Sequence, residues 1–159
     1  MIVRTALLSL ALVAAPVFAD EPAYRDDRSD AAALIGSLYN AIDRQEYARA
    51  WEYFDDPKPA ASFEAFAQGY AGTAGVELRT GASVSDGAAG SVYFEVPVAI
   101  RATDAQGATR VFAGCYVVRQ VDPAIQEPPF RPLLIVSGKL APSEAELDAA
   151  PPESCPEAG

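Results

Sequence analysis

The spacing of the apolar residues changes near residue 70, and this change most constrains what the 159-residue chain can fold into. Between residues 30 and 70, apolar side chains recur every three or four positions, which is the spacing of one face of an α-helix. From residue 76 to residue 140, apolar and polar side chains alternate instead, as they do in a strand with one buried face. The chain therefore predicts helices followed by strands, an α+β fold.

Three helices are predicted in the first half of the chain, at about residues 30–44, 46–54 and 62–68. Ser29 or Asp30 can cap the first helix and Ser62 the third, because their side-chain oxygens accept hydrogen bonds from unpaired backbone N–H groups. The prolines within residues 55–59 end the second helix, since proline cannot continue the helical hydrogen-bond ladder.

Four strands are predicted in the second half, at about residues 76–84, 92–101, 109–120 and 133–140. Turns at 85–87 and 103–107 join the first three strands, and a proline-rich loop at 122–132 precedes the last. Pro97 lacks a backbone N–H, so we expect it at an edge or a bulge. The prediction is three N-terminal helices packed on a curved four-stranded antiparallel sheet, with the helices on one face only.

The net charge of the chain makes some classes of binding partner unfavourable. The chain has 22 acidic and 12 basic residues and a formal net charge of −10 at pH 7. An acidic surface repels phosphate groups, so nucleic acid and anionic membrane surfaces are poor partners.

The first 19 residues have the pattern of a secretory signal peptide. Arg4 precedes an apolar run over residues 6–15, which is too short to span a bilayer, and the small residues Val17 and Ala19 predict cleavage before Asp20. No cysteine stands at the new N-terminus, which argues against a lipid anchor, and no later stretch is long and apolar enough to span a membrane. We therefore expect a periplasmic or secreted protein. Its predicted segments are a signal peptide at 1–19, a loose lead-in at 20–29, a domain at 30–141 and a C-terminal tail at 142–159, which the disulfide would tie back.

The chain has two cysteines, Cys115 and Cys155. An even count in an exported chain favours an intrachain disulfide, although two unpaired thiols or an interchain bond are the alternatives. If Phe112 and Tyr116 face the helices, period-2 geometry turns Cys115 to the other face of the sheet. The tail would then cross that outer face to bring Cys155 to its partner.

Three segments resemble the nuclear transport factor 2-like superfamily, which includes the SnoaL-like cyclases and the ketosteroid isomerases. They read SLYNAIDRQEYARAWEYF, SFEAFAQGYAGT and FAGCYVV. The resemblance covers about residues 30–140 and is of the form typical of exported bacterial members. It implies a cone in which the sheet curls round the first helix and leaves an apolar pocket between them. Members of this superfamily use that pocket for catalysis or for ligand binding, and others use the sheet face to dimerise, so the fold alone does not give the function.

The aromatic residues that the pattern places near such a pocket are Tyr39, Trp51, Phe66, Tyr70, Phe94, Phe112 and Tyr116. For Trp51, Phe66 and Phe94, we expect plain core packing to explain the residue. The predicted ligand pocket nevertheless keeps Trp51 and consists of Tyr39, Trp51, Tyr70, Phe112 and Tyr116. The tyrosines are better candidates, because a buried hydroxyl requires a hydrogen-bond partner that a ligand can supply.

Catalytic machinery is harder to find in the sequence. Glu95 could serve as a base beside Tyr39, Tyr70, Tyr93 or Tyr116, but its position alternates with the apolar residues of its strand and predicts the solvent face. The chain has no histidine, which excludes a His–Asp pair and Ser–His or Cys–His nucleophiles. Four arginines fall on strands without an aspartate to join them: Arg79, Arg101, Arg110 and Arg119. We therefore predict no catalytic residues, no metal site and no cofactor.

Three hypotheses remain. The first is an exported, non-enzymatic domain that binds an apolar small molecule or a protein partner in an aromatic-lined pocket. The second is an isomerase- or cyclase-like enzyme acting on an apolar molecule. The third is a structural envelope module that forms a homodimer through its sheet face.

Overall fold

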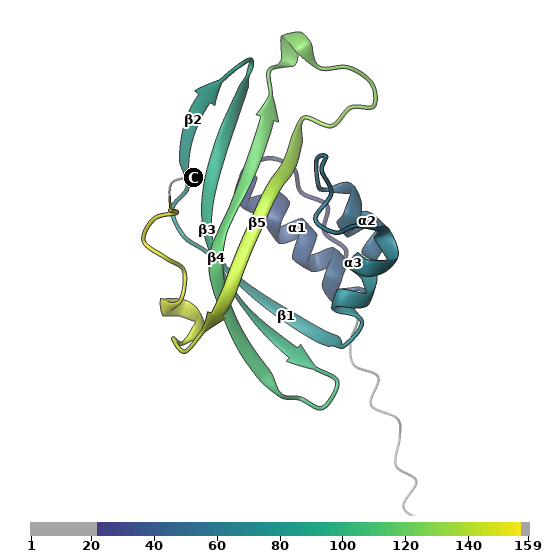
Figure 1. Ribbon diagram of the computed structural model, residues 1–159, viewed down its shortest axis with the longest axis vertical. Helices are drawn as coiled ribbons and strands as arrows, with labels where there is room; N and C mark the ends of the chain where they lie inside the picture. Colours follow the sequence, from purple (N-terminus) through teal and green to yellow (C-terminus); the bar gives the residue numbers. More distant parts are fainter. Residues whose placement is uncertain (1–21, 157–159) are drawn as a thin grey trace, which may run out of the picture.

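The computed structural model describes residues 22–156 as three helices followed by one antiparallel sheet (Figure 1). The helices are α1 (Ala31–Asp43), α2 (Tyr47–Glu52) and α3 (Phe63–Tyr70). The strands are β1 (Thr73–Thr80), β2 (Val84–Ala88), β3 (Ser91–Asp104), β4 (Thr109–Val121) and β5 (Leu133–Ser143). Two short 3-10 turns, η1 (Pro123–Ile125) and η2 (Leu147–Ala149), lie in the β4–β5 loop and in the tail. The α+β class is confirmed.

Side-chain caps set the helix starts, as the sequence predicts. Asp30 accepts a hydrogen bond from the backbone N–H of Ala33 at the start of α1, and Ser62 does the same for Ala65 in α3. Each cap satisfies an N–H group that has no partner within its own helix.

The sheet has five strands within the described residues, so the predicted count of four is wrong. The order is β1-β3-β4-β5, and β2 also pairs with β3. The predicted first strand, 76–84, is in fact split at residues 81–83, and the predicted turn at 85–87 lies inside β2. The true turn contains Ala89 and Gly90, whose φ angles of 50° and 73° suit a tight hairpin turn.

Pro97 explains why the first strand divides in two. β1 pairs with β3 from Val98 onward, whereas β2 pairs with β3 only as far as Glu95. The backbone N–H of Gly81 donates to the carbonyl of Pro97 at 2.8 Å, in the gap between these two partners. Because the nitrogen and the carbonyl of one strand residue point to the same side, the N–H that proline lacks would have pointed into this gap.

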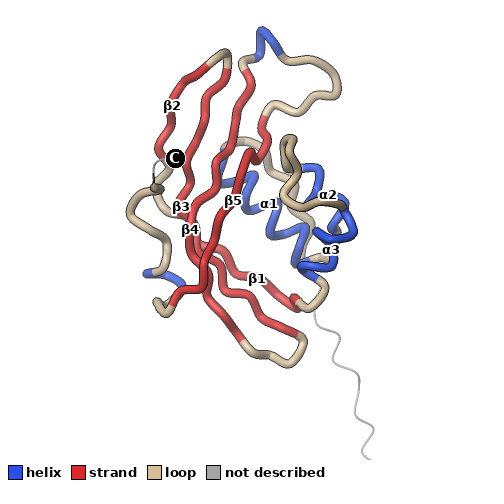
Figure 2. Tube along the Cα trace, in the orientation of Figure 1, coloured by secondary structure: helices blue, strands red, loops and turns tan. Residues whose placement is uncertain are grey.

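The helices lie in the concave side of the curved sheet, as the layers in Figure 2 show. The main core lies between them and contains α1 residues such as Leu34, Ile35 and Leu38 together with Val96, Val98 and Val118 of the sheet. All six side chains are fully buried. Even-numbered positions of β3 and β4 therefore face the helices, as the alternation predicts.

The C-terminal tail lies on the opposite, convex face of the sheet (Figure 1). Leu147 and Ala150 are buried there against Ala99 of β3. Cys115 and Cys155 form the disulfide, with an S–S distance of 2.05 Å. The predicted path of the tail across the outer face, and its bond to Cys115, are both confirmed.

The predicted signal peptide, residues 1–19, lies outside the described residues. Among residues 22–156, no helix has the length and apolar character needed to cross a membrane.

Candidate functional site

A cavity of about 440 Å³ opens on the concave face, beside the β3–β4 hairpin and the junction of α3 with β1. This volume is within the range of roughly 300–1,000 Å³ that small-molecule sites occupy. The cavity has more apolar than polar exposed surface. Its lining consists of Tyr39, Gly69, Tyr70, Gly72, Thr73, Ile100, Ala102, Thr103, Asp104, Ala108, Arg110, Phe112 and Leu140.

Strand alternation supplies one wall of this cavity. Ile100 and Ala102 of β3 lie two residues apart, as do Arg110 and Phe112 of β4, so each pair shares the concave face. The two strands are in register, with Ala102 opposite Arg110 and Ile100 opposite Phe112. This wall is apolar except for the guanidinium group of Arg110.

Glycines help to keep the cavity open. A Cβ atom added to Gly69 or Gly72 would meet no other atom within 4 Å, so each glycine borders open space. Gly138 of β5 has the opposite role, because a Cβ there would collide with the ring of Tyr116. The bare backbone at residue 138 therefore allows Tyr116 to lie flat against β5.

Two tyrosine hydroxyls meet beside the cavity, which Tyr39 lines. The hydroxyl oxygens of Tyr39 and Tyr116 are 2.7 Å apart, and their rings pack edge to face. Both side chains are buried. In such a pair one hydroxyl donates and the other accepts, so one O–H group remains available to donate to a third group.

Burial keeps these tyrosines neutral. It raises the pKa of Tyr39 well above its ordinary value, and the neighbouring Tyr116 adds to the shift. Burial likewise raises the pKa values of Tyr116 and Tyr70. The phenolate form is disfavoured in each case, so these side chains act as hydrogen-bond donors and apolar surface rather than as bases.

The lining of the cavity contains two charged side chains, Asp104 and Arg110. The carboxylate of Asp104 accepts hydrogen bonds of 2.9 Å from the backbone N–H groups of Gln106 and Ala108, which fold the hairpin turn. The guanidinium of Arg110 has no hydrogen bond or ion pair with any residue in the described chain.

A second cavity, of about 540 Å³, lies between α1, β1 and the lead-in residues 22–30. Its carboxylates already have structural partners. Asp30 caps α1, the carboxylate of Asp27 accepts from the N–H of Ser29, and that of Asp43 accepts from the N–H of Val76. The polar groups of this second cavity therefore hold the fold together, and the first cavity is the better candidate for a ligand site.

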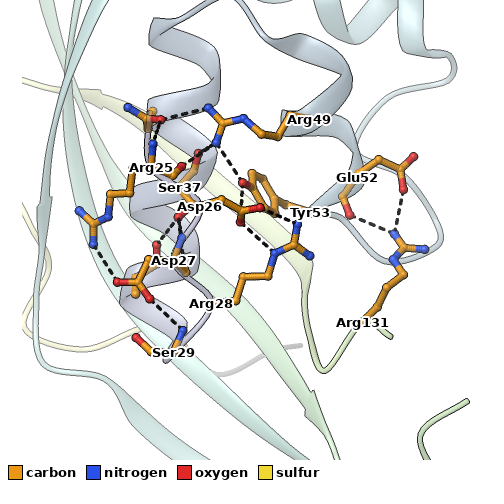
Figure 3. Close-up of polar contacts among 12 residues, drawn as sticks. Arg25, Asp26, Asp27, Arg28, Ser29, Ser37, Arg49, Glu52, Tyr53 and Arg131 are labelled. Atoms are coloured by element: carbon orange, nitrogen blue, oxygen red, sulfur yellow. Dashed lines mark hydrogen bonds and ion pairs between the residues drawn. The ribbon is translucent and has the colours of Figure 1, made fainter. Parts of the chain in front are cut away.

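The lead-in is bonded to the helices more extensively than the sequence suggests (Figure 3). Asp27 exchanges hydrogen bonds with the buried hydroxyl of Ser37, and the hydroxyl of Tyr53 donates to Asp26 at 3.0 Å. The hydrogen bond from Arg28 to Asp26 is the largest of the effects that lower the pKa of that carboxyl. Arg49 donates to the carbonyl of Arg25 at 2.7 Å. The polar composition of this segment predicted a loose lead-in and gave no sign of these contacts.

The structure brings some of the candidate residues together and separates others. Tyr39, Tyr70 and Phe112 line the cavity, and Tyr116 lies next to it through its bond to Tyr39. Trp51 lies elsewhere, packed edge to face between α2 and α3 on Phe63 and Phe66. The disulfide partners lie on the convex face, and Glu95 is at an odd-numbered, convex-face position of β3.

Sequence reasoning missed several lining residues. Ile100 and Leu140 were predicted only as strand residues, and Ala102 lies between the predicted strand 92–101 and the predicted turn 103–107. Arg110 was considered only as a partner for an absent aspartate. The alternation of β4 held the missing signal, because Arg110 and Phe112 are two residues apart and so share a face.

Comparisons with known proteins leave the family open, since no family model matches this chain and no curated protein matches its sequence.

Proposed function

We propose that this is an exported, non-enzymatic domain that binds an apolar small molecule in the concave cavity. The observation that carries the proposal is the lining itself: apolar side chains from helices and strands surround an open volume, with a few polar side chains among them. We also propose that the chain belongs to the nuclear transport factor 2-like superfamily. This proposal is supported by the helices that lie on the concave side of a curved sheet.

Export is part of the proposal. Disulfides form and persist in oxidising compartments, and Cys115–Cys155 is such a bond. The signal-peptide pattern of residues 1–19 supports the same compartment.

The contacts of the cavity favour binding over the isomerase-like alternative. That alternative requires a carboxylate within hydrogen-bond reach of a tyrosine hydroxyl inside the cavity. Asp104 is the one carboxylate in the lining, and its Oδ1 atom accepts from two N–H groups of the turn. The hydroxyl of Tyr39 bonds to that of Tyr116 instead.

The homodimer alternative requires a free sheet face. The tail occupies part of the convex face, where Leu147 and Ala150 cover Ala99. A second copy of the chain would have to displace this tail or bind beside it, so we favour a small molecule as the partner.

Fluorescence titration with N-phenyl-1-naphthylamine, a neutral apolar fluorophore, tests the proposal. We expect saturable binding to the oxidised protein and at least a tenfold loss of affinity in Gly72→Phe, which places a ring in the open space at that wall. Ala102→Phe fills the cavity from the opposite wall and should act alike. Gly87→Phe, at an exposed position of β2 with open space around it, is the matched control. Absence of saturable binding, or equal loss in Gly87→Phe, would overturn the proposal.

A further inference from the structure

Arg110 differs from every other arginine between residues 22 and 156. Each of the others is in an ion pair: Arg25 with Asp27, Arg28 with Asp26, Arg44 and Arg49 with Glu46, Arg79 with Asp148, Arg101 with Glu77, Arg119 with Asp55, and Arg131 with Glu52. Arg110 alone has no carboxylate partner, in a chain with nearly twice as many acidic as basic residues.

The unpaired guanidinium lies at the cavity. Arg110 is part of the lining, two residues from Phe112 on β4 and opposite Ala102 on β3. Asp104 is the one carboxylate in the lining, and it forms no ion pair with Arg110; its Oδ1 atom accepts from the N–H groups of the turn instead. The cavity therefore presents a guanidinium group that no carboxylate binds, beside an apolar wall.

This arrangement suits an amphipathic anion. A guanidinium group offers a planar fork of donors that matches a carboxylate with two parallel hydrogen bonds. The strongly acidic chain repels anions in general, so a ligand needs an apolar body as well as a charge to remain bound. A cationic ligand would meet Arg110 as a like charge, and a neutral one would leave its donors unused.

We infer that the ligand of this cavity is an apolar molecule with a single carboxylate-like group, whose body lies against Phe112 and Ile100 and whose anion binds Arg110. The inference rests on the proposed function and adds the chemical class of the ligand to it. The hydroxyl pair of Tyr39 and Tyr116 lies beside the cavity, where Tyr39 can meet an oxygen on the body.

Two related fluorophores separate the inference from the proposed function. N-phenyl-1-naphthylamine is neutral, and 1-anilinonaphthalene-8-sulfonate has the same ring system with an added sulfonate anion. We expect Arg110→Ala to weaken sulfonate binding at least tenfold and to change neutral-probe binding less than threefold. Arg110→Lys should give an intermediate loss, because it keeps the charge without the fork.

Arg101→Ala is the matched control, because it removes the same charge from the neighbouring strand at a residue paired with Glu77 on the other face. It should change neither probe more than threefold. The inference would be overturned if Arg110→Ala and Arg101→Ala changed sulfonate binding equally. The proposed function would still stand in that case, provided that the neutral probe binds the wild-type protein and is excluded by Gly72→Phe. Loss of saturable binding for both probes in the wild-type protein would overturn both.

Displacement experiments then identify the body of the ligand. Decanoate and 2-naphthoate present the same anion on an alkyl and an aromatic body, and we expect at least one of them to displace the sulfonate probe from the wild-type protein. Displacement by decanoate alone indicates an alkyl ligand, and displacement by 2-naphthoate alone an aromatic one. Displacement by neither would contradict the inference.

Discussion

The two faces of the sheet are built from the same strands but are covered differently. On the convex face, the protein's own tail covers part of β3 and β4, at Ala99, Val111 and Ala113, and a disulfide holds it there. On the concave face, the helices cover most of the apolar residues but leave a cavity beside the β3–β4 hairpin. The chain's own tail thus covers part of the convex face, whereas the concave face keeps an open cavity.

Strand β4 shows how one sequence produces both faces. Ala113 and Cys115 point to the convex side, where small side chains let the tail pack closely. Phe112 and Tyr116 point to the concave side, where the ring of Phe112 lines the cavity and Tyr116 lies beside it. Along this one strand, small side chains face the packed tail and large rings face the cavity.

The largest expected effect comes from opening the convex face. The double variant Cys115→Ser/Cys155→Ser should lose about 4 kcal/mol of unfolding free energy, because the disulfide closes a loop across a sequence separation of 40 residues. Urea unfolding of the wild type and the variant measures this difference. Neutral-probe affinity should stay within threefold of wild type, since the cavity is on the other face. A loss of less than about 1 kcal/mol of unfolding free energy would contradict this prediction, because it would show that the tail packs on the sheet without the disulfide.

A smaller effect is expected from crowding the concave face. Gly138→Ala places a methyl group against the ring of Tyr116 and should cost roughly 1–3 kcal/mol, the usual range for overpacking. Gly87→Ala, in open space on β2, is the control and should change the stability by less than about 0.5 kcal/mol. Thermal unfolding of both variants measures the difference. Equal stabilities would mean that the ring moves aside without loss.

The smallest effect is a loss of stability at high pH that originates on the concave face. Burial raises the pKa values of Tyr39 and Tyr116 in the folded protein, whereas the unfolded chain releases these protons near pH 10. The stability contribution is therefore complete below about pH 10 and is lost as the pH rises toward the folded values. Urea unfolding between pH 8 and pH 11 measures the slope, which Tyr116→Phe should reduce. A slope that is the same in Tyr116→Phe and wild type would contradict the role of the pair.

Much of the fold follows from the sequence, and the reasons for the exceptions are physical. Asp30 and Ser62 are found as caps because capping depends on local chemistry alone. The turn at Ala89 and Gly90 was missed because Ser-Asp-Gly at 85–87 has equally typical turn residues, and only the pairing with β3 decides between them.

The candidate site was predicted less completely than the fold. Tyr39, Tyr70 and Phe112 line the cavity, as expected of aromatic residues near a large apolar surface. Trp51 lies in the α2–α3 contact instead, because its spacing in the sequence does not tell these two places apart. Gly72 and Ala102 border the cavity through the absence of a large side chain, which no pattern of apolar residues reveals.

Methyl NMR during titration with N-phenyl-1-naphthylamine tests the open concave face most directly. Ile100 and Leu140 line the cavity, while Leu147 belongs to the tail and is buried against the convex face. We predict saturable shifts of the Ile100 and Leu140 methyl signals while those of Leu147 stay in place. Shifts at Leu147 with Ile100 and Leu140 unchanged would contradict the assignment of the concave cavity as the binding site.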